Sequence, residues 1–216
     1  MFCKVIDRGK SRKLYLYSLN KKNYKKIKGL DSVDQKGQHM RWNSLRDEWV
    51  FYSPLRQSRT FLPSENNCPL CASVKGKTLT DIPVTDYEIA VFDNRFSALS
   101  IVSQNITKIE GILNEQSYGR CEVISYTSDH NASLKTLSIE QVSLLMKVWS
   151  ERYMHLMQDK NIKYVLPFEN KGEEIGVTLE HPHGQIYAMS MIPEIINRQA
   201  INQKEKNIVN NLVKSI

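Results

Sequence analysis

The sequence predicts an α+β domain in which antiparallel strands pack against one crossover helix. Short runs of aromatic and β-branched residues recur along the chain between turn-forming residues, which is the pattern of antiparallel strands. One strongly amphipathic segment follows Ser138 and has apolar residues at helical spacing. With 216 residues, 41% of them hydrophobic and 25% charged, the chain is long enough for one large domain or two small ones.

The first 40 residues carry the basic charge of the chain. They hold eleven of its 30 Lys and Arg residues and three of its 23 acidic residues, whereas the remainder is close to neutral. This distribution argues against nucleic-acid binding by the body of the protein. The mixture of basic residues with Tyr, Leu and Ile at 13–17 and 24–28 allows either a pair of edge strands or a flexible basic arm. Because charge runs are usually solvated, we predict a basic N-terminal extension over residues 1–40.

Residues 41–192 are expected to form the folded domain. Aromatic and β-branched residues on both sides of a polar turn predict two short strands within residues 42–52. Further apolar runs predict strands at residues 87–92, 121–126, 163–168 and 178–188.

Ser138 and Gln141 have the spacing of a capping box, which predicts that a helix begins at this point. The residues expected on its buried side follow the i, i+3, i+4 rule. They are Val142, Leu145, Met146, Trp149, Tyr153 and Leu156. Pro193 is expected to begin a C-terminal helix over residues 193–216.

The cysteines favour a metal site over disulfides. No apolar run is long enough for a signal-peptide core or a transmembrane helix, so we expect a cytoplasmic protein, in which disulfides are rare. Cys68 and Cys71 have the Cys-x-x-Cys spacing that puts two thiolates on one zinc ion. Zinc prefers four tetrahedral ligands, so two more must come from elsewhere.

The segment His181-Pro182-His183-Gly184-Gln185 constrains the chemistry most. If it lies in a strand, then His181, His183 and Gln185 share one face. One imidazole can bind a metal ion and the other can act as a neutral nucleophile, since its ordinary pKa is about 6.5. The Gln185 amide can donate hydrogen bonds to a developing oxyanion. The alternative is a pair of packed and hydrogen-bonded histidines.

Polar side chains in two loops suit a nucleotide. Arg56 and Arg59 can clamp phosphate oxygens bidentately, although such arginines are more often surface charges. Asn94 and Phe96 lie in a polar and aromatic turn suited to a base or a sugar ring. His130 is expected just beyond a strand end.

Six motifs in a fixed order carry a resemblance to a known family. They are Arg41-Trp42-Asn43 with Trp49-Val50 and Ser53-Pro54-Leu55-Arg56, Cys68-Pro69-Leu70-Cys71, Phe92-Asp93-Asn94-Arg95-Phe96-Ser97-Ala98-Leu99, Ser128-Asp129-His130, Phe168-Glu169-Asn170-Lys171-Gly172 and His181-Pro182-His183-Gly184-Gln185. On these motifs the chain resembles the galactose-1-phosphate uridylyltransferases, a branch of the histidine-triad superfamily. The resemblance implies a histidine-triad-like antiparallel sheet with a crossover helix and a structural zinc site.

The resemblance also implies a role for each candidate residue. His183 would attack the α-phosphorus of UDP-glucose to give a uridylyl-histidine, and a hexose 1-phosphate would then take the uridylyl group in a ping-pong cycle. Gln185 would hold phosphoryl oxygens, and Arg56 and Arg59 would offset diphosphate charge. The zinc ligands would be Cys68, Cys71, His130 and His181, a set that favours zinc over iron. The substrate-binding residues around the uridine would be Leu70, Phe92, Asn94, Val123 and Asn170. Thr178 would bind a phosphate.

The resemblance covers residues 41–199, the first of two similar halves in family members. It implies that residues 193–216 lead to a second half that this sequence lacks, and that a homodimer or a partner chain supplies it. Gln199 stands where some members have a Glu that helps hold a second metal, so we predict no second metal site. The alternatives are a related nucleotide phosphorylase or hydrolase, and an inactive zinc-stabilised nucleotide-binding remnant.

Overall fold

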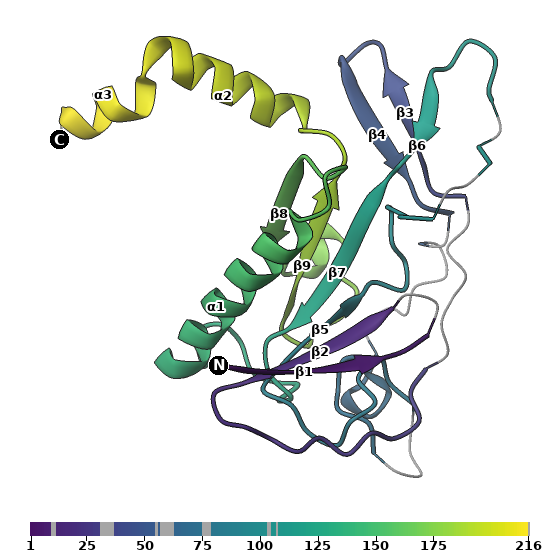
Figure 1. Cartoon of the computed structure of the whole chain (residues 1–216), viewed down its shortest axis with the longest axis vertical. Helices are drawn as coiled ribbons and strands as arrows, with labels where there is room; N and C mark the ends of the chain where they lie inside the picture. Colours follow the sequence, from purple (N-terminus) through teal and green to yellow (C-terminus); the bar gives the residue numbers. More distant parts are fainter. Residues whose placement is uncertain are drawn as a thin grey trace.

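Two antiparallel sheets and three α-helices make up the described part of the fold in the computed structural model (Figure 1). The structure describes residues 1–9, 12–30, 37–54, 56, 63–74, 79–102, 105–106 and 108–215. The larger sheet has the strand order β1-β2-β5-β7-β9-β8. Its strands are β1 (Phe2–Asp7), β2 (Lys13–Ser18), β5 (Ile89–Asp93), β7 (Gly119–Ser125), β8 (Tyr164–Phe168) and β9 (His183–Met189). The predicted α+β class with antiparallel strands is therefore confirmed.

The smaller sheet has the order β4-β3-β6, with β3 (His39–Asn43), β4 (Glu48–Tyr52) and β6 (Asn114–Gln116). β3 and β4 form the strand pair expected within residues 42–52, and they pair antiparallel around the predicted polar turn. Two short 3-10 helices, η2 (Glu65–Asn67) and η3 (Glu173–Ile175), lie in connecting loops.

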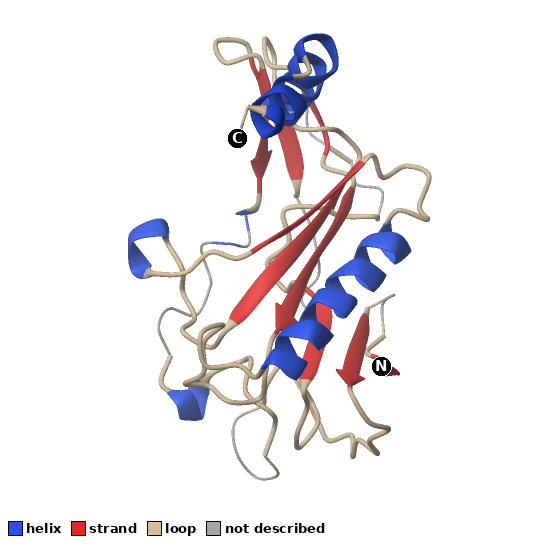
Figure 2. Ribbon diagram, turned by 90° about the vertical axis from the view of Figure 1, so that its left-hand side faces the viewer, coloured by secondary structure: helices blue, strands red, loops and turns tan. Residues whose placement is uncertain are grey.

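Side chains of β7 alternate between the two faces of the larger sheet. Ile124 points to the face covered by α1 (Ile139–Leu156) and packs there in one cluster with Leu145. Figure 2 shows α1 lying across this face. Val123 points to the opposite face and packs with Leu70 from a connecting loop. The helix thus closes one face, and any site built on the central strands has to form on the other.

The helix α1 begins where the capping box predicts it. The Ser138 hydroxyl accepts a hydrogen bond from the Gln141 amide nitrogen at 3.2 Å, as at a helix N-cap. The predicted buried side is wrong at two positions, because Met146 and Tyr153 are 44% and 40% exposed. Arg152 is buried instead. Leu144 and Val148 are buried as well, so the inward side of the helix is the one that carries these three residues.

A buried ion pair joins α1 to β7. Arg152 Nη2 lies 2.6 Å from Glu122 Oε1, and the two side chains are 2% and 3% exposed. Glu122→Ala leaves the guanidinium buried without its partner, so we expect the free energy of unfolding in a urea titration to fall by about 3–5 kcal/mol. Glu115→Ala, at an exposed position of β6, is the matched control and should cost less than about 0.5 kcal/mol. Equal losses in the two variants would contradict the prediction.

The basic N-terminal segment is part of the larger sheet rather than a solvated extension. β1 pairs with β2 along its whole length, and β2 pairs in turn with β5. Leu14 and Leu16 are fully buried, whereas Lys13, which begins β2 next to the turn, is exposed. The predicted extension is therefore wrong for these strands, and the strand-pair alternative holds. Leu14 and Leu16 recur with the period of two that places side chains on one buried face of a strand.

Two helices, not one, follow Pro193. They are α2 (Glu194–Lys206) and α3 (Ile208–Lys214). The break lies at Asn207, which has the left-handed φ of 49° that asparagine tolerates at a helix end. Figure 1 shows both helices extending away from the sheets, and neither contains a buried residue. None of the helices among the described residues is long and apolar enough to cross a membrane.

Candidate active site and metal centre

The strand β9 begins at His183, so the predicted strand over residues 178–188 is shorter than expected at its start. Pro182 has no amide hydrogen, although its carbonyl still accepts a bond from the Tyr126 nitrogen at 3.1 Å. β9 pairs with β7 so that Val123 lies opposite Gln185. His183 and Gln185 therefore share the sheet face away from α1. The expectation that His181 lies in the same strand is wrong.

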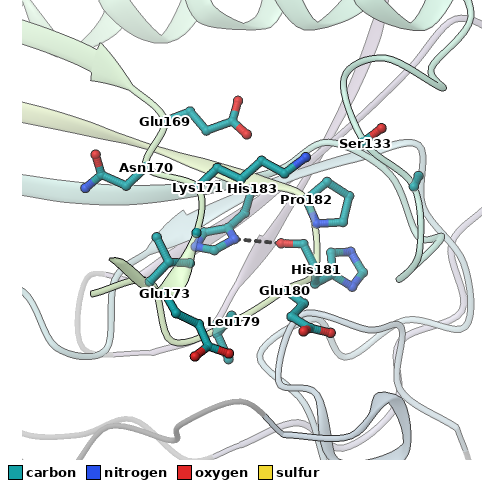
Figure 3. A pocket seen from close by; sticks show the side chains of 13 residues that line it. Ser133, Glu169, Asn170, Lys171, Glu173, Leu179, Glu180, His181, Pro182 and His183 are labelled. Carbon is teal, nitrogen blue, oxygen red and sulfur yellow. Dashed lines mark hydrogen bonds between the residues drawn. The ribbon is translucent and has the colours of Figure 1, made fainter. Parts of the chain in front are cut away.

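The His183 ring is held in one orientation by the chain before it. Its Nδ1 atom lies 2.7 Å from the carbonyl oxygen of His181, as the dashed line in Figure 3 shows. Because a carbonyl oxygen only accepts, Nδ1 carries the hydrogen and Nε2 keeps its lone pair. Burial lowers the pKa of His183, which favours the neutral ring. The imidazole therefore has the protonation pattern of a nucleophile.

His183 lines three adjoining cavities with volumes of about 300, 320 and 430 Å³. The cavity of about 320 Å³ collects most of the predicted substrate-binding residues. Those at its wall are Arg56, Leu70, Phe92, Asn94, Val123 and Thr178, together with His183 and Gln185. Asn170 lines the other two cavities. Arg59 lies outside the described residues.

A chain of hydrogen bonds orients Gln185. The Phe96 backbone nitrogen donates to Asn94 Oδ1 at 2.8 Å, so the Asn94 amide group turns its Nδ2 outward. Asn94 Nδ2 then donates to Gln185 Oε1 at 3.2 Å. The oxygen of Gln185 is thereby engaged, and its Nε2 donors remain for a ligand.

Asn94→Ala should weaken this orientation without disturbing the fold. We expect affinity for a nucleotide to fall about tenfold or more, because Gln185 can then turn its oxygen toward the phosphoryl group. Isothermal titration with UMP measures the loss. Asn161→Ala, at an exposed position after α1, is the control and should bind UMP as the wild type does. Unchanged affinity in Asn94→Ala would contradict the role of this hydrogen bond.

Several site residues were missed from the sequence. Tyr187 follows His183 and Gln185 on the same face of β9 and accepts a hydrogen bond from Arg56 Nη2. The period of two along a strand would have found it. Asp81 and Arg95 line the same cavity as Gln185. Arg95 lies within the polar and aromatic turn predicted to suit a base or a sugar ring, whereas nothing in the local sequence of Asp81 indicates this position.

The four predicted metal ligands come together. One ligand atom from each of Cys68, Cys71, His130 and His181 lies within 4.8 Å of all the others. Cys71 Sγ lies 3.5 Å from Nδ1 of both histidines. Zinc bonds of about 2.3 Å to sulfur and 2.0 Å to nitrogen, set at the tetrahedral angle, place these atoms about 3.5 Å apart. The donor set and its spacing therefore fit a tetrahedral cation.

The surroundings of the cluster also fit a metal centre. His181 is fully buried, and its Nε2 atom lies 2.8 Å from the Thr127 carbonyl oxygen, which fixes Nδ1 as the ligand atom. A hydrogen bond from Cys71 lowers the pKa of Cys68 to about 3 and raises that of Cys71. Metal binding requires thiolates, so a cation bound by both sulfurs would displace the proton of this hydrogen bond.

Comparisons with known proteins show the family of this chain. Residues 28–193 match the family model described as galactose-1-phosphate uridyl transferase, N-terminal domain. The galactose-1-phosphate uridylyltransferase of Thermotoga maritima is 40% identical over 159 residues, which are 73% of this chain and 48% of that protein. The enzyme of that name from Streptomyces lividans is 43% identical over 132 residues, 61% of this chain and 32% of that protein.

A solved uridylyltransferase structure shows the same fold, with a TM-score of 0.65 and 23% identity over 80% of this chain and 52% of that one. The chain spans about half the length of the Thermotoga relative and less of the Streptomyces one. Because the family match covers most of the chain, and the fold agrees with it, the chain belongs to the galactose-1-phosphate uridyl transferase family and matches the N-terminal domain of that family.

Proposed function

We propose that this chain carries the uridylyl-transfer site of a UDP-glucose:hexose-1-phosphate uridylyltransferase, and that His183 is its nucleophile. The observation that carries the proposal is the hydrogen bond from His183 Nδ1 to the His181 carbonyl oxygen. It directs the Nε2 lone pair to the reaction, beside the Gln185 amide in a cavity with an apolar wall.

In the first half-reaction, His183 Nε2 attacks the α-phosphorus of UDP-glucose. A phosphorus–nitrogen bond forms, and the bond to the bridging oxygen breaks, so that glucose 1-phosphate leaves with the electron pair. The Nδ1 hydrogen keeps its hydrogen bond to the His181 carbonyl oxygen, and this hydrogen bond stabilises the positive charge of the uridylyl-imidazole. Gln185 Nε2 donates to a non-bridging oxygen, and Arg56 offsets the diphosphate charge.

In the second half-reaction, a hexose 1-phosphate attacks the same phosphorus and the bond to His183 breaks.

Apolar side chains form the uridine slot, and the amides of Asn94 and Asn170 orient the polar edges of the uridine. Thr178 supplies a hydroxyl for a phosphate. Arg59 belongs to the same proposal as a further cation for the diphosphate. The residues of the apolar slot are Leu70, Phe92 and Val123.

We infer that zinc occupies the cluster of Cys68, Cys71, His130 and His181, since two thiolates and two imidazoles favour zinc. When bound, the zinc contributes folding free energy and fixes its ligands. His181 is both a ligand and, through its carbonyl, the residue that orients His183. Metal binding and nucleophile orientation are thus joined at one residue.

The length of the relatives supports the rest of the proposed assembly. We infer that a second copy or a partner chain completes the hexose side of the site, and that the protein works in the cytoplasm on UDP-glucose and hexose 1-phosphate. Residues 41–192 would be the catalytic unit, and residues 193–216 would lead toward the second half.

Mass spectrometry after exposure to UDP-glucose tests the function directly. We expect a uridylyl mass on the peptide that contains His183, and its loss when galactose 1-phosphate is added. An adduct formed only from a dinucleoside polyphosphate would replace the proposal with a related phosphorylase or hydrolase. Binding of UDP with no adduct from either compound would indicate an inactive nucleotide-binding remnant.

A further inference from the structure

The N-terminal hairpin of β1 and β2 lies outside the residues that match the family, yet it is built into the sheet that carries the site. β2 pairs with β5 from Leu14 opposite Phe92 to Tyr17 opposite Ile89. Figure 1 shows the hairpin along this edge of the sheet. Phe92 lines the nucleotide cavity. The hairpin therefore supports the strand from which one wall of that cavity is made.

Arg8, at the turn end of β1, reaches three residues of the cavity wall. Its Nη2 atom lies 3.4 Å from Asp81 Oδ1 and 3.3 Å from the Leu30 carbonyl oxygen. Its guanidinium carbon lies 6.0 Å from the centre of the Phe92 ring. Leu30, Asp81 and Phe92 all line the cavity of about 320 Å³ that also holds His183. Arg8 thus lies behind the wall and contacts it at three points.

Asp81 joins Arg8 to a second arginine. Arg95 Nη1 lies 3.7 Å from the Oδ1 atom of Asp81 that Arg8 also contacts, and Arg95 lines the cavity. The side chains of Arg8 and Asp81 are 8% and 7% exposed, whereas that of Arg95 is 20% exposed. The carboxylate therefore bridges a buried cation behind the wall and a cation that reaches the cavity.

Stability alone is a poor account of this arrangement. Buried ion pairs seldom stabilise a fold more than apolar residues of similar size would. The Nη1 atom of Arg8 is also buried with no hydrogen-bond partner among the described residues, which adds a desolvation cost. A network with such a cost, at the wall of a site, is better explained by a role in that site.

We propose that Arg8 is a positioning residue of the nucleotide site, which holds Asp81 so that Asp81 directs the Arg95 guanidinium toward the nucleoside of a uridine nucleotide. Arg95 donates hydrogen bonds there to base carbonyl or ribose oxygens. This inference rests on the proposed function, because it assigns the cavity to the uridylyl group. It adds a segment outside the family match to the substrate site.

The test measures UMP affinity by isothermal titration in the full chain for Arg8→Met, Arg95→Met and the double variant. Methionine keeps an apolar stem and removes the charge and the donors. We expect each single variant to bind UMP about tenfold more weakly. If Arg8 acts through Arg95, the double variant loses no more than either single one, since the effects are coupled. Lys4→Met, at an exposed position of the same hairpin, should bind as the wild type does.

Each outcome decides the inference. Wild-type affinity in a folded Arg8→Met chain, or additive losses in the double variant, overturns the positioning role and leaves the proposed function standing. Failure of the wild type to bind UMP overturns both. If Arg8→Met does not fold, Arg8→Lys decides in its place. Weaker UMP binding at an unchanged melting temperature supports the role, and wild-type affinity overturns it.

Discussion

His183→Ala should abolish the covalent uridylyl adduct while leaving the fold and the metal content intact. The substitution removes the only atom that our mechanism uses to form the phosphorus–nitrogen bond, so the rate of uridylyl transfer should fall by about 10⁴-fold or more. His183 is not a member of the metal cluster, and it is only partly buried, so its loss should cost little stability. Mass spectrometry with UDP-glucose measures the adduct, and elemental analysis measures the metal.

His155→Ala is the matched control for this experiment. His155 is exposed on α1, on the far side of the sheet from the site, and its loss should leave the adduct unchanged. An adduct that persists in His183→Ala would show that another residue is the nucleophile. An adduct lost in both variants would point to a general effect on folding rather than to the chemistry of His183.

The sequence was most informative where residue type alone restricts the chemistry. Cys-x-x-Cys spacing indicated two ligands of a metal site, and the His-x-His pair suggested one ligand and one nucleophile, whereas the full ligand set and the choice of His183 as nucleophile came only with the family resemblance. Ser138 likewise marked the start of α1, because N-cap chemistry is local. These predictions depend on neighbours in the sequence or on rare residue types.

The misses depend on tertiary contacts. Arg152 has no local signal for burial, and its partners, the Glu122 carboxylate and the Tyr15 ring, lie on strands distant in the sequence. Leu144 and Val148, which the predicted apolar stripe omitted, are buried on the same side of the helix, and Met146 and Tyr153 are left exposed. Burial of the N-terminal hairpin could not be predicted for a related reason, since its scattered basic residues suggest solvent unless the residues between them are seen to pack on β5.

Cys68→Ser should lower both metal content and thermal stability. A serine hydroxyl is a poor ligand for zinc, and a structural zinc site contributes several kcal/mol to folding. Cys68 is 1% exposed, so solvent has little access to replace its sulfur as a metal ligand. We expect the melting temperature to fall by about 10 °C or more, with bound metal well below one equivalent. Scanning calorimetry and elemental analysis measure the two losses together.

Cys3→Ser is the matched control, because Cys3 is an exposed thiol on β1. It should leave both quantities at wild-type values. Wild-type protein treated with a chelator should lose stability as Cys68→Ser does, and it should also form the uridylyl adduct more slowly. The second loss follows if His181 holds the metal through Nδ1, because its carbonyl oxygen also orients His183. A metal-free wild type with unchanged stability would remove the metal centre from this account, and one with unchanged adduct formation would separate it from the nucleophile.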